Sequence, residues 1–346
     1  MGHHKTLLKT VAVCVAALCI AGFVVEQMGR FEQTGRLQDR NRIQQIGQSV
    51  NIGGRTLDIY CSGAGGPTIV FDTFGHMSGY SWNAVQGEVA RFTHACWYDR
   101  AYYGWSDPAP ASPRTFRSVA ADLHALLRAA AIPPPYVLVG GGDAASHIRV
   151  YHGMYPREVA GVVMENANDV DDPKVEIPES AKGPWAKHFG SFAPGVRGAA
   201  CVFFPILGRT GVARLASGSQ KLRPTGSFEL TPEQQNELDF LPDNPTAQQG
   251  SELCDREESM QQVRAAGDLG NIPLVVLAST DRAPTAPSDS RSAEAVWNRH
   301  QVEQVQPGLA RLSSRGRLIL LNGDVTADSI VTAVREVVGA LTQASH

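Results

Sequence analysis

The feature that most constrains the fold is an alternation of short apolar runs with helical patterns across residues 49–342. Strands that alternate with helices are typical of a parallel sheet covered by helices on both faces, that is, an α/β fold. The predicted strands are Ser49–Ile52, Thr56–Cys61, Thr68–Asp72, His94–Tyr98, Tyr136–Val139, Gly161–Glu165, Leu274–Ala278 and Leu318–Leu321. The predicted helices are Trp82–Arg91, Pro113–Ala130, Ala144–Met154, Ala293–Leu312 and Ala327–Leu341. Gly53-Gly54 predicts a hairpin turn between the first two strands.

Residues 170–271 interrupt this alternation between the sixth and seventh predicted strands. The stretch is rich in Gly, Pro and Gln and contains an amphipathic piece at Val202–Leu215. An insertion at this point is the usual place for a cap over a substrate pocket. A functional lid and a decorative helical insertion both fit the pattern. We therefore expect one domain over 47–342 with a cap at about 170–271.

The N-terminal segment, residues 1–25, has a different character. Lys5 and Lys9 precede an uncharged run from Thr10 to Val25, which is near the short limit of about 17–25 residues for a membrane span. We expect an uncleaved membrane anchor, with a cleaved signal peptide as the alternative. The lysines predict a cytoplasmic N-terminus and a periplasmic or extracellular domain, which would be secreted if the segment were cleaved. The polar residues 26–46 are predicted to form a stalk.

Composition excludes several other classes of protein. The 31 basic and 34 acidic side chains give a net charge of only −3, so the clustered basic excess of a nucleic-acid-binding surface is missing. No HExxH or CxxC spacing is present, so we expect no metal and no cofactor. Four cysteines lie outside the apolar run, which permits three disulfide pairings in an oxidising compartment or four unpaired thiols.

Three stretches resemble motifs of the α/β-hydrolase fold. FDTFGHMSGYSW, from Phe71 to Trp82, is similar to the loop that supplies an oxyanion-hole amide. YDRAYYGWSDP, from Tyr98 to Pro108, resembles the DRxGxGxSD motif with Tyr102 in place of its first glycine. The stretch from Pro135 to Asn166 resembles the strand, nucleophile elbow, helix and following strand.

The order of these stretches resembles the serine-hydrolase and esterase-like superfamily from about Ser49 to Thr342. The resemblance implies a mostly parallel eight-stranded sheet with a cap between strands 6 and 7. It also implies that one pocket is lined by the residues Phe74, Gly75, His76 and Asp143. Since the second and fourth strands are neighbours in this fold, it implies two disulfides, Cys61 with Cys96 and Cys201 with Cys254.

Two positions of the catalytic triad depart from the pattern that the resemblance implies. The elbow of a serine hydrolase reads G-x-S-x-G, and here Gly142 occupies the position of the serine. A glycine carries no atom that can attack a carbonyl. The loop after the last strand, residues 322–326, contains no histidine, and the only histidine beyond Leu320 is His346. We therefore predict that the serine-hydrolase triad is inactive.

The acid position and the elbow each leave alternatives. Asp281 and Glu165 occupy the two usual places for the acid of the triad. Asp143 is predicted to be the N-cap of the following helix, where its carboxylate would accept amide hydrogen bonds. Alternatively Asp143 is itself a nucleophile, as in haloalkane dehalogenases. Ser146 and His147 are adjacent on a helix and therefore do not face each other.

The sequence thus predicts a membrane-anchored α/β-hydrolase-fold protein without triad chemistry, which binds a small apolar ligand or a protein partner. The alternative is an active hydrolase of ester-like or halide substrates with a relocated nucleophile such as Asp143. The prediction of inactivity fails if the fold brings another nucleophile and a histidine within hydrogen-bonding distance in the crevice.

Overall fold

The computed structural model describes residues 2–42, 45–73, 77–109, 113–169, 254–280 and 293–344. Its centre is an eight-stranded sheet in the order β1-β2-β4-β3-β5-β6-β7-β8. The strands are β1 Gln48–Asn51, β2 Thr56–Ser62, β3 Thr68–Asp72, β4 Ala95–Tyr98, β5 Tyr136–Gly141, β6 Val159–Glu165, β7 Leu274–Ser279 and β8 Gly316–Leu321. The β1–β2 and β2–β4 pairs are antiparallel, and the other neighbours are parallel. All eight predicted strands are confirmed to within two residues at each end.

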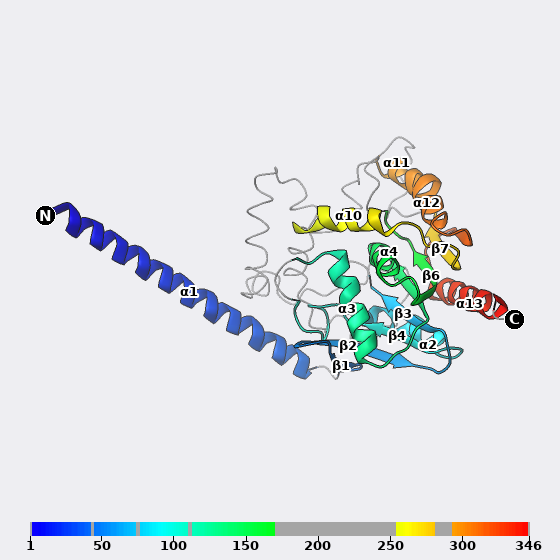
Figure 1. Cartoon of the computed structure of the whole chain (residues 1–346), viewed down its shortest axis with the longest axis horizontal. Coiled ribbons are helices and arrows are strands. Elements are labelled where there is room, and N and C mark those ends of the chain that lie inside the picture. Colours follow the sequence, from blue (N-terminus) through cyan, green and yellow to red (C-terminus); the bar gives the residue numbers. More distant parts are fainter. Residues whose placement is uncertain are drawn as a thin grey trace.

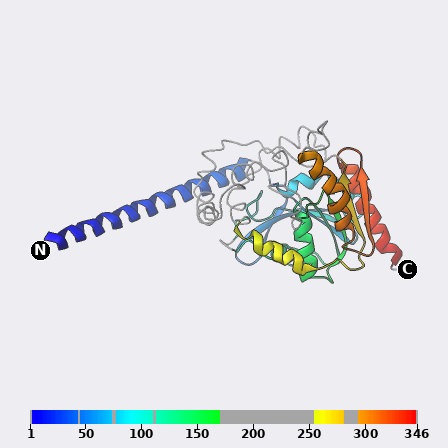
Figure 2. The ribbon, with the colours of Figure 1, turned by 90° about the horizontal axis from the view of Figure 1, so that it is seen from above.

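Helices cover both faces of the sheet (Figure 1 and Figure 2). One face packs against α3 Phe116–Ala129, α4 Ala144–Met154, α10 Arg256–Ala266 and α12 Gln306–Ala310. The other packs against α2 Asn83–Val89, which follows the short helix η1 Gly79–Trp82, and against α13 Ala327–Ala344. Every residue of β3 and β5 is buried, as expected for parallel strands covered on both sides.

The predicted helix Ala293–Leu312 is divided in the structure. It consists of α11 Ala293–His300, a π-helical turn at Gln301–Val305 and α12. Pro307 lies in the first turn of α12. Because proline has no backbone N–H and its ring clashes with the preceding turn, it interrupts a regular helix at this point.

The N-terminal helix α1, Gly2–Arg42, projects away from the sheet (Figure 1). It runs without a break through the predicted apolar segment and most of the predicted stalk. Across the described residues, none of the helices combines the length and the apolar character that crossing a bilayer requires.

The last part of the predicted cap contains Asp255 and α10, whose side chains accept N–H groups at and just before the start of α3. Asp255 Oδ2 accepts the Arg114 N–H at 2.5 Å, Ser259 Oγ accepts the Phe116 N–H at 3.2 Å, and Gln262 Oε1 accepts the Arg117 N–H at 2.8 Å. The first N–H groups of a helix lack partners within the helix, so the bonds to Ser259 and Gln262 satisfy those of Phe116 and Arg117. The remainder of the predicted cap, 170–253, lies outside the described residues.

Replacing Gln262 by alanine should lower the free energy of unfolding by about 1–2 kcal/mol, because the Arg117 N–H loses its partner. Urea unfolding followed by circular dichroism measures the change. Gln261 is the matched control, since it lies beside Gln262 on the same helix but is exposed. Gln261→Ala should change stability by less than about 0.5 kcal/mol, and equal effects of the two variants would contradict the assigned contact.

Candidate active site

The turn between β5 and α4 has the backbone geometry of the predicted elbow. Gly142 lies between the two elements with a φ of 53°, in the left-handed region that glycine adopts without strain. Its N–H donates to the Glu165 carbonyl at 3.1 Å, and its own carbonyl accepts the Asn168 N–H at 3.1 Å. Gly142 is buried. The elbow is thus tied to the segment after β6, and the residue at its apex offers only backbone.

The glycines before the apex allow close packing of the elbow. A Cβ on Gly140 would lie 2.8 Å from the Cβ of Ala144, so α4 approaches the end of β5 more closely than larger residues would allow. A Cβ on Gly141 would lie 2.3 Å from the Oε2 atom of Glu165. Glu165, one of the two predicted acid positions, is only 3% exposed at the end of β6. Its Oε1 accepts the Asn166 Nδ2–H at 3.0 Å, so the carboxylate makes a local contact.

Asp143 takes the predicted N-cap position of α4 without making the predicted bond. Its side chain forms no capping hydrogen bond, and its own backbone is already helical, at φ −73° and ψ −18°. An N-cap residue normally has extended backbone angles, which turn its side chain back to the helix N–H groups. The Asp143 carboxylate instead accepts the Asn168 Nδ2–H at 3.3 Å. The prediction of an amide-capping carboxylate was therefore wrong.

Several predicted positions lie outside the described residues: Phe74, Gly75, His76, Asp281, Cys201 and His346. The loop from β8 to α13, residues 322–326, is described, and it reads Asn-Gly-Asp-Val-Thr. Within this loop only Val325 is fully buried. No imidazole therefore comes from this loop, which is the place where the resembled family carries its histidine.

The DRxGxGxSD-like motif holds the loops around the site. The Asp99 carboxylate accepts the Gly79 N–H at 2.7 Å and the Trp105 N–H at 3.1 Å. Ser106 Oγ donates to the Asp99 carbonyl at 2.6 Å and accepts the Asp58 N–H at 2.8 Å. The motif therefore holds β2, β4 and the start of η1 together, so its role here is structural.

Tyr102, which replaces a glycine of that motif, adopts a φ of 76°. This conformation costs a non-glycine residue about 1–3 kcal/mol. The side chain offsets part of this cost, because it is 97% buried and its hydroxyl donates to the Ala109 carbonyl at 3.2 Å.

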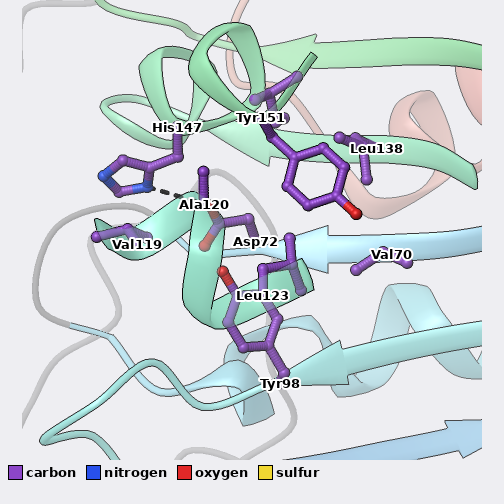
Figure 3. Close-up of a pocket in the computed structure, with 10 residues that line it drawn as sticks. Val70, Asp72, Tyr98, Val119, Ala120, Leu123, Leu138, His147 and Tyr151 are labelled. Atoms are coloured by element: carbon purple, nitrogen blue, oxygen red, sulfur yellow. Dashed lines mark hydrogen bonds and ion pairs between the residues drawn. The ribbon is translucent and has the colours of Figure 1, made fainter. Parts of the chain in front are cut away.

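A buried charged cluster that the sequence did not predict lies beside the elbow (Figure 3). Asp72, at the end of β3, pairs in register with Gly140 of β5. Its Oδ2 atom lies 3.1 Å from Nδ1 of His147 on α4, and Arg100 Nη1 lies 3.2 Å from the same nitrogen. One ring nitrogen either donates or accepts, so only one of these contacts is a hydrogen bond for a given tautomer. Asp72, Arg100 and His147 are each no more than 5% exposed as side chains.

The residues around this cluster form a small cavity of about 10 Å³, at the lower limit for one water molecule. Asp72, His147 and Tyr98 line it together with apolar side chains of α3 and α4 (Figure 3). Burial, followed by the negative charge of Asp72, raises the pKa of the Tyr98 hydroxyl well above its usual range. Tyr98 therefore stays a neutral phenol and is a poor nucleophile.

Asp72 and His147 bear on the prediction of inactivity. That prediction fails if another nucleophile and a histidine lie within hydrogen-bonding distance in the crevice. A carboxylate and a histidine do meet near the elbow. However, both side chains are at least 95% buried, and the cavity beside them measures only about 10 Å³. Within the described part of the chain, Nδ1 of His147 lies beside Asp72 and Arg100, and the ring packs edge-on against Phe116. Buried in this way among the described residues, the pair has little access to a substrate.

The predicted disulfide between Cys61 and Cys96 is confirmed, with a Cα–Cα distance of 4.1 Å. The two residues oppose each other on the antiparallel strands β2 and β4. Cys254 is also disulfide-bonded, whereas its predicted partner Cys201 lies outside the described residues.

We compared the sequence and the fold with those of known proteins. No family model matches the sequence, and no curated protein matches it. Among solved structures, the haloalkane dehalogenase DbeA from Bradyrhizobium elkani USDA94 is 18% identical, with 86% of this chain and 99% of that chain covered at a TM-score of 0.56. A thermophilic esterase from Thermogutta terrifontis is 15% identical, with coverages of 85% and 98% and a TM-score of 0.56.

An α/β-hydrolase fold protein from Burkholderia ambifaria is 18% identical, with coverages of 85% and 98% and a TM-score of 0.56. At these identities the likeness concerns the fold alone. Strand order, the glycine elbow and the motif after β4 agree with it. This chain therefore has the α/β-hydrolase fold.

Proposed function

We propose that this protein is a non-catalytic member of the α/β-hydrolase fold, a pseudoenzyme held at a membrane. One observation carries the proposal: the residue at the apex of the elbow is Gly142, whose backbone groups are both hydrogen-bonded and which has no side chain. The loop of residues 322–326 supplies no histidine as a base. A serine hydrolase needs both groups, since the histidine removes the proton from the attacking hydroxyl.

Covalent labelling tests this proposal. The full chain, purified in detergent, should remain unmodified by a fluorophosphonate probe, while a serine esterase in the same reaction is labelled. Gly142→Ser should also remain unlabelled, because a serine without a histidine base is not activated. Stoichiometric labelling of the native protein at any residue, located by mass spectrometry, would overturn the proposal.

The alternative is hydrolysis with Asp143 as a relocated nucleophile. Asp143 is only partly buried and lies directly after the apex. A screen of short acyl esters and haloalkanes should show at most about 10³–10⁴-fold acceleration over water. This is the residual acceleration that an enzyme keeps when members of its triad are removed. Asp143→Asn should leave that rate unchanged. A faster reaction that collapses in Asp143→Asn would establish the alternative.

Without catalysis, the role that remains for the crevice is binding. That it binds a small apolar ligand or a protein partner stays a prediction.

The proposed membrane tether rests on the N-terminal helix. Large apolar side chains are exposed along α1, with Ile20 at 65% and Phe23 at 62%. Between Val15 and Val25 the helix carries no charge, and Lys5 and Lys9 precede it. An uncharged apolar stretch behind basic residues favours burial of its apolar side chains in a bilayer, with the lysines at the cytoplasmic surface.

Vesicle flotation tests the tether. The full chain, transferred from detergent to vesicles of phosphatidylcholine and phosphatidylglycerol, should float with the lipid. The double substitution Ile20→Lys with Phe23→Lys should reduce the floating fraction at least about tenfold, since each lysine costs several kcal/mol in the hydrocarbon. Leu37→Lys is the matched control, because Leu37 is 54% exposed on the same helix beyond the apolar run. Equal flotation of all three proteins would reject the tether.

A further inference from the structure

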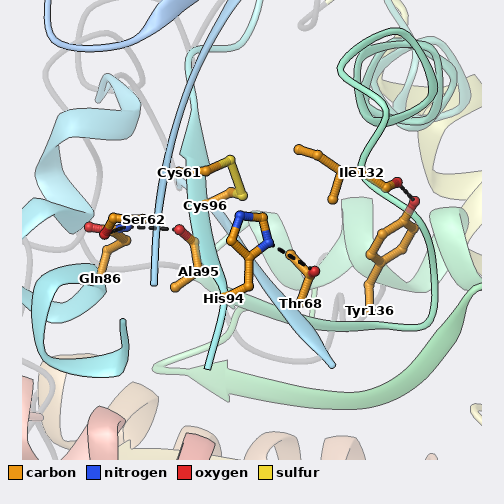
Figure 4. The surroundings of a disulfide bond; sticks show 9 residues. All are labelled: Cys61, Ser62, Thr68, Gln86, His94, Ala95, Cys96, Ile132 and Tyr136. Carbon is orange, nitrogen blue, oxygen red and sulfur yellow. Dashed lines mark hydrogen bonds between the residues drawn. A yellow bond between two sulfur atoms is a disulfide. The ribbon is translucent and has the colours of Figure 1, made fainter. Parts of the chain in front are cut away.

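A second group of reactive side chains lies on and beside β2 and β4, away from the elbow at the carboxyl end of β5. The Cys61–Cys96 disulfide joins β2 and β4, and His94 comes directly before β4. Side chains two residues apart on a strand point to the same face, so His94 and Cys96 lie side by side. One ligand atom from each of Cys61, His94 and Cys96 lies within 4.8 Å of the others. Figure 4 shows the imidazole against the disulfide.

The orientation of His94 is fixed by a contact of its other ring nitrogen. Nδ1 lies 3.1 Å from the Thr68 hydroxyl on β3, which leaves the Nε2 side of the ring facing the sulfur atoms (Figure 4). Histidines that bind metals are commonly held in this way, with one nitrogen bonded to an oxygen and the other on the metal. Cys61 and His94 are partly exposed, so the group is reached from solvent, while Cys96 is fully buried.

The spacing suits a thiophilic metal ion. Tetrahedral Zn²⁺, with Zn–S bonds of about 2.3 Å and Zn–N bonds of about 2.0–2.1 Å, holds its ligand atoms roughly 3.5–3.8 Å apart. The ligand atoms of the three side chains lie within 4.8 Å of one another, and reduction would free the two bonded sulfurs to separate to that distance. In the disulfide, however, the two sulfurs are bonded to each other and are not the thiolates that a metal requires.

We propose that reduction of the Cys61–Cys96 disulfide creates a Cys₂His site for Zn²⁺, with Cys61, Cys96 and His94 as ligands and water in the fourth position. A protein dithiol supplies two electrons and two protons, the S–S bond breaks to give two thiols, and the dithiol becomes a disulfide. Zn²⁺ then binds both sulfurs as thiolates, whose two protons pass to water, and the neutral Nε2 of His94. The site is separate from the elbow and does not depend on the proposed function.

Spacing along the chain did not reveal this group, because Cys61 lies 35 residues from Cys96 and the residues come from two strands. Only the antiparallel pairing of β2 with β4 brings them together.

Cobalt titration tests the proposal, since Co²⁺ bound by thiolates gives a sulfur-to-metal charge-transfer absorption. The full chain is reduced with a phosphine, freed of reductant without oxygen and titrated with Co²⁺. One equivalent should produce the band, Zn²⁺ should displace it, and the oxidised protein should show none. Cys96→Ser should abolish the band, and His94→Ala should weaken Co²⁺ binding at least tenfold.

Two control variants separate this site from the other cysteines. Cys19→Ala, which removes the exposed free thiol, and Cys254→Ser, which removes the second disulfide, should both retain the band. The proposal is overturned by absence of the band in the reduced wild type, by its survival in Cys96→Ser or by unaltered affinity in His94→Ala. A reduced protein that loses its native circular dichroism also overturns it, because the site requires paired strands.

Discussion

Replacing Arg100 by methionine should lower the free energy of unfolding by about 3–5 kcal/mol. Arg100 is 2% exposed, and its guanidinium lies 4.0 Å from the Asp72 carboxylate. Without it, the buried Asp72 carboxylate loses its nearby positive charge and keeps the His147 ring at 3.1 Å. Removing one partner of a buried ion pair is strongly destabilising, because the other charge remains out of water without compensation. Urea unfolding of the full chain, followed by tryptophan fluorescence, measures the change.

A double-mutant cycle identifies the cause of that loss. Arg100→Met should cost at least about 1 kcal/mol less when Asp72 is already asparagine, since no buried charge is then left unpaired. The control is the exposed pair of Arg91 with Glu88, whose side chains are 74% and 46% exposed. Arg91→Met should change stability by less than about 1 kcal/mol. Strictly additive losses for Arg100 and Asp72 would show that the two residues do not act as a pair.

Gly104→Ala should destabilise the protein by about 3–5 kcal/mol. Gly104 has a φ of 46°, and a Cβ there would lie 1.9 Å from the Asp99 Oδ2 atom. The substitution therefore adds backbone strain of about 1–3 kcal/mol and displaces the carboxylate that accepts the Gly79 and Trp105 N–H groups. The midpoint of urea unfolding should fall accordingly.

Gly87→Ala should have the opposite effect and raise the free energy of unfolding. Gly87 is an exposed residue within α2, and a Cβ there would meet nothing within 4 Å. Alanine is the better helix former, so this variant should gain about 0.5–1 kcal/mol. If both glycine variants changed stability by the same amount, the assigned role of Asp99 in holding the loops would be wrong.

The sheet was predictable because its strands carry a local signal. β3 and β5 are buried on both faces, so their sequences are continuous apolar runs, and the glycines at 53 and 54 mark the hairpin. The glycine elbow was also predictable from its place between a strand and a helix. The π-helical turn before Pro307 was not, since the helical pattern continues through it.

The charged cluster beside the elbow was missed for a different reason. Asp72 and Arg100 come at or just after the carboxyl ends of β3 and β4, which are neighbours in the sheet. This is the edge where polar residues of α/β proteins gather, so their positions carried a signal. His147 gave none, because its partners lie 75 and 47 residues away. The absent amide contact of Asp143 depended on backbone angles that the sequence does not reveal.

Hydrogen bonds hold both ends of the segment between Asp169 and Cys254 to the domain. On the N-terminal side, Asn168 bonds to Gly142, and Gln306 Nε2–H donates to the Ala167 carbonyl at 2.8 Å. On the C-terminal side, Asp255 accepts the Arg114 N–H just before α3. The entropy of closing a loop changes by only about 0.6 kcal/mol when its length doubles. Related chains can therefore lengthen, shorten or exchange this segment while the sheet and the elbow keep their geometry.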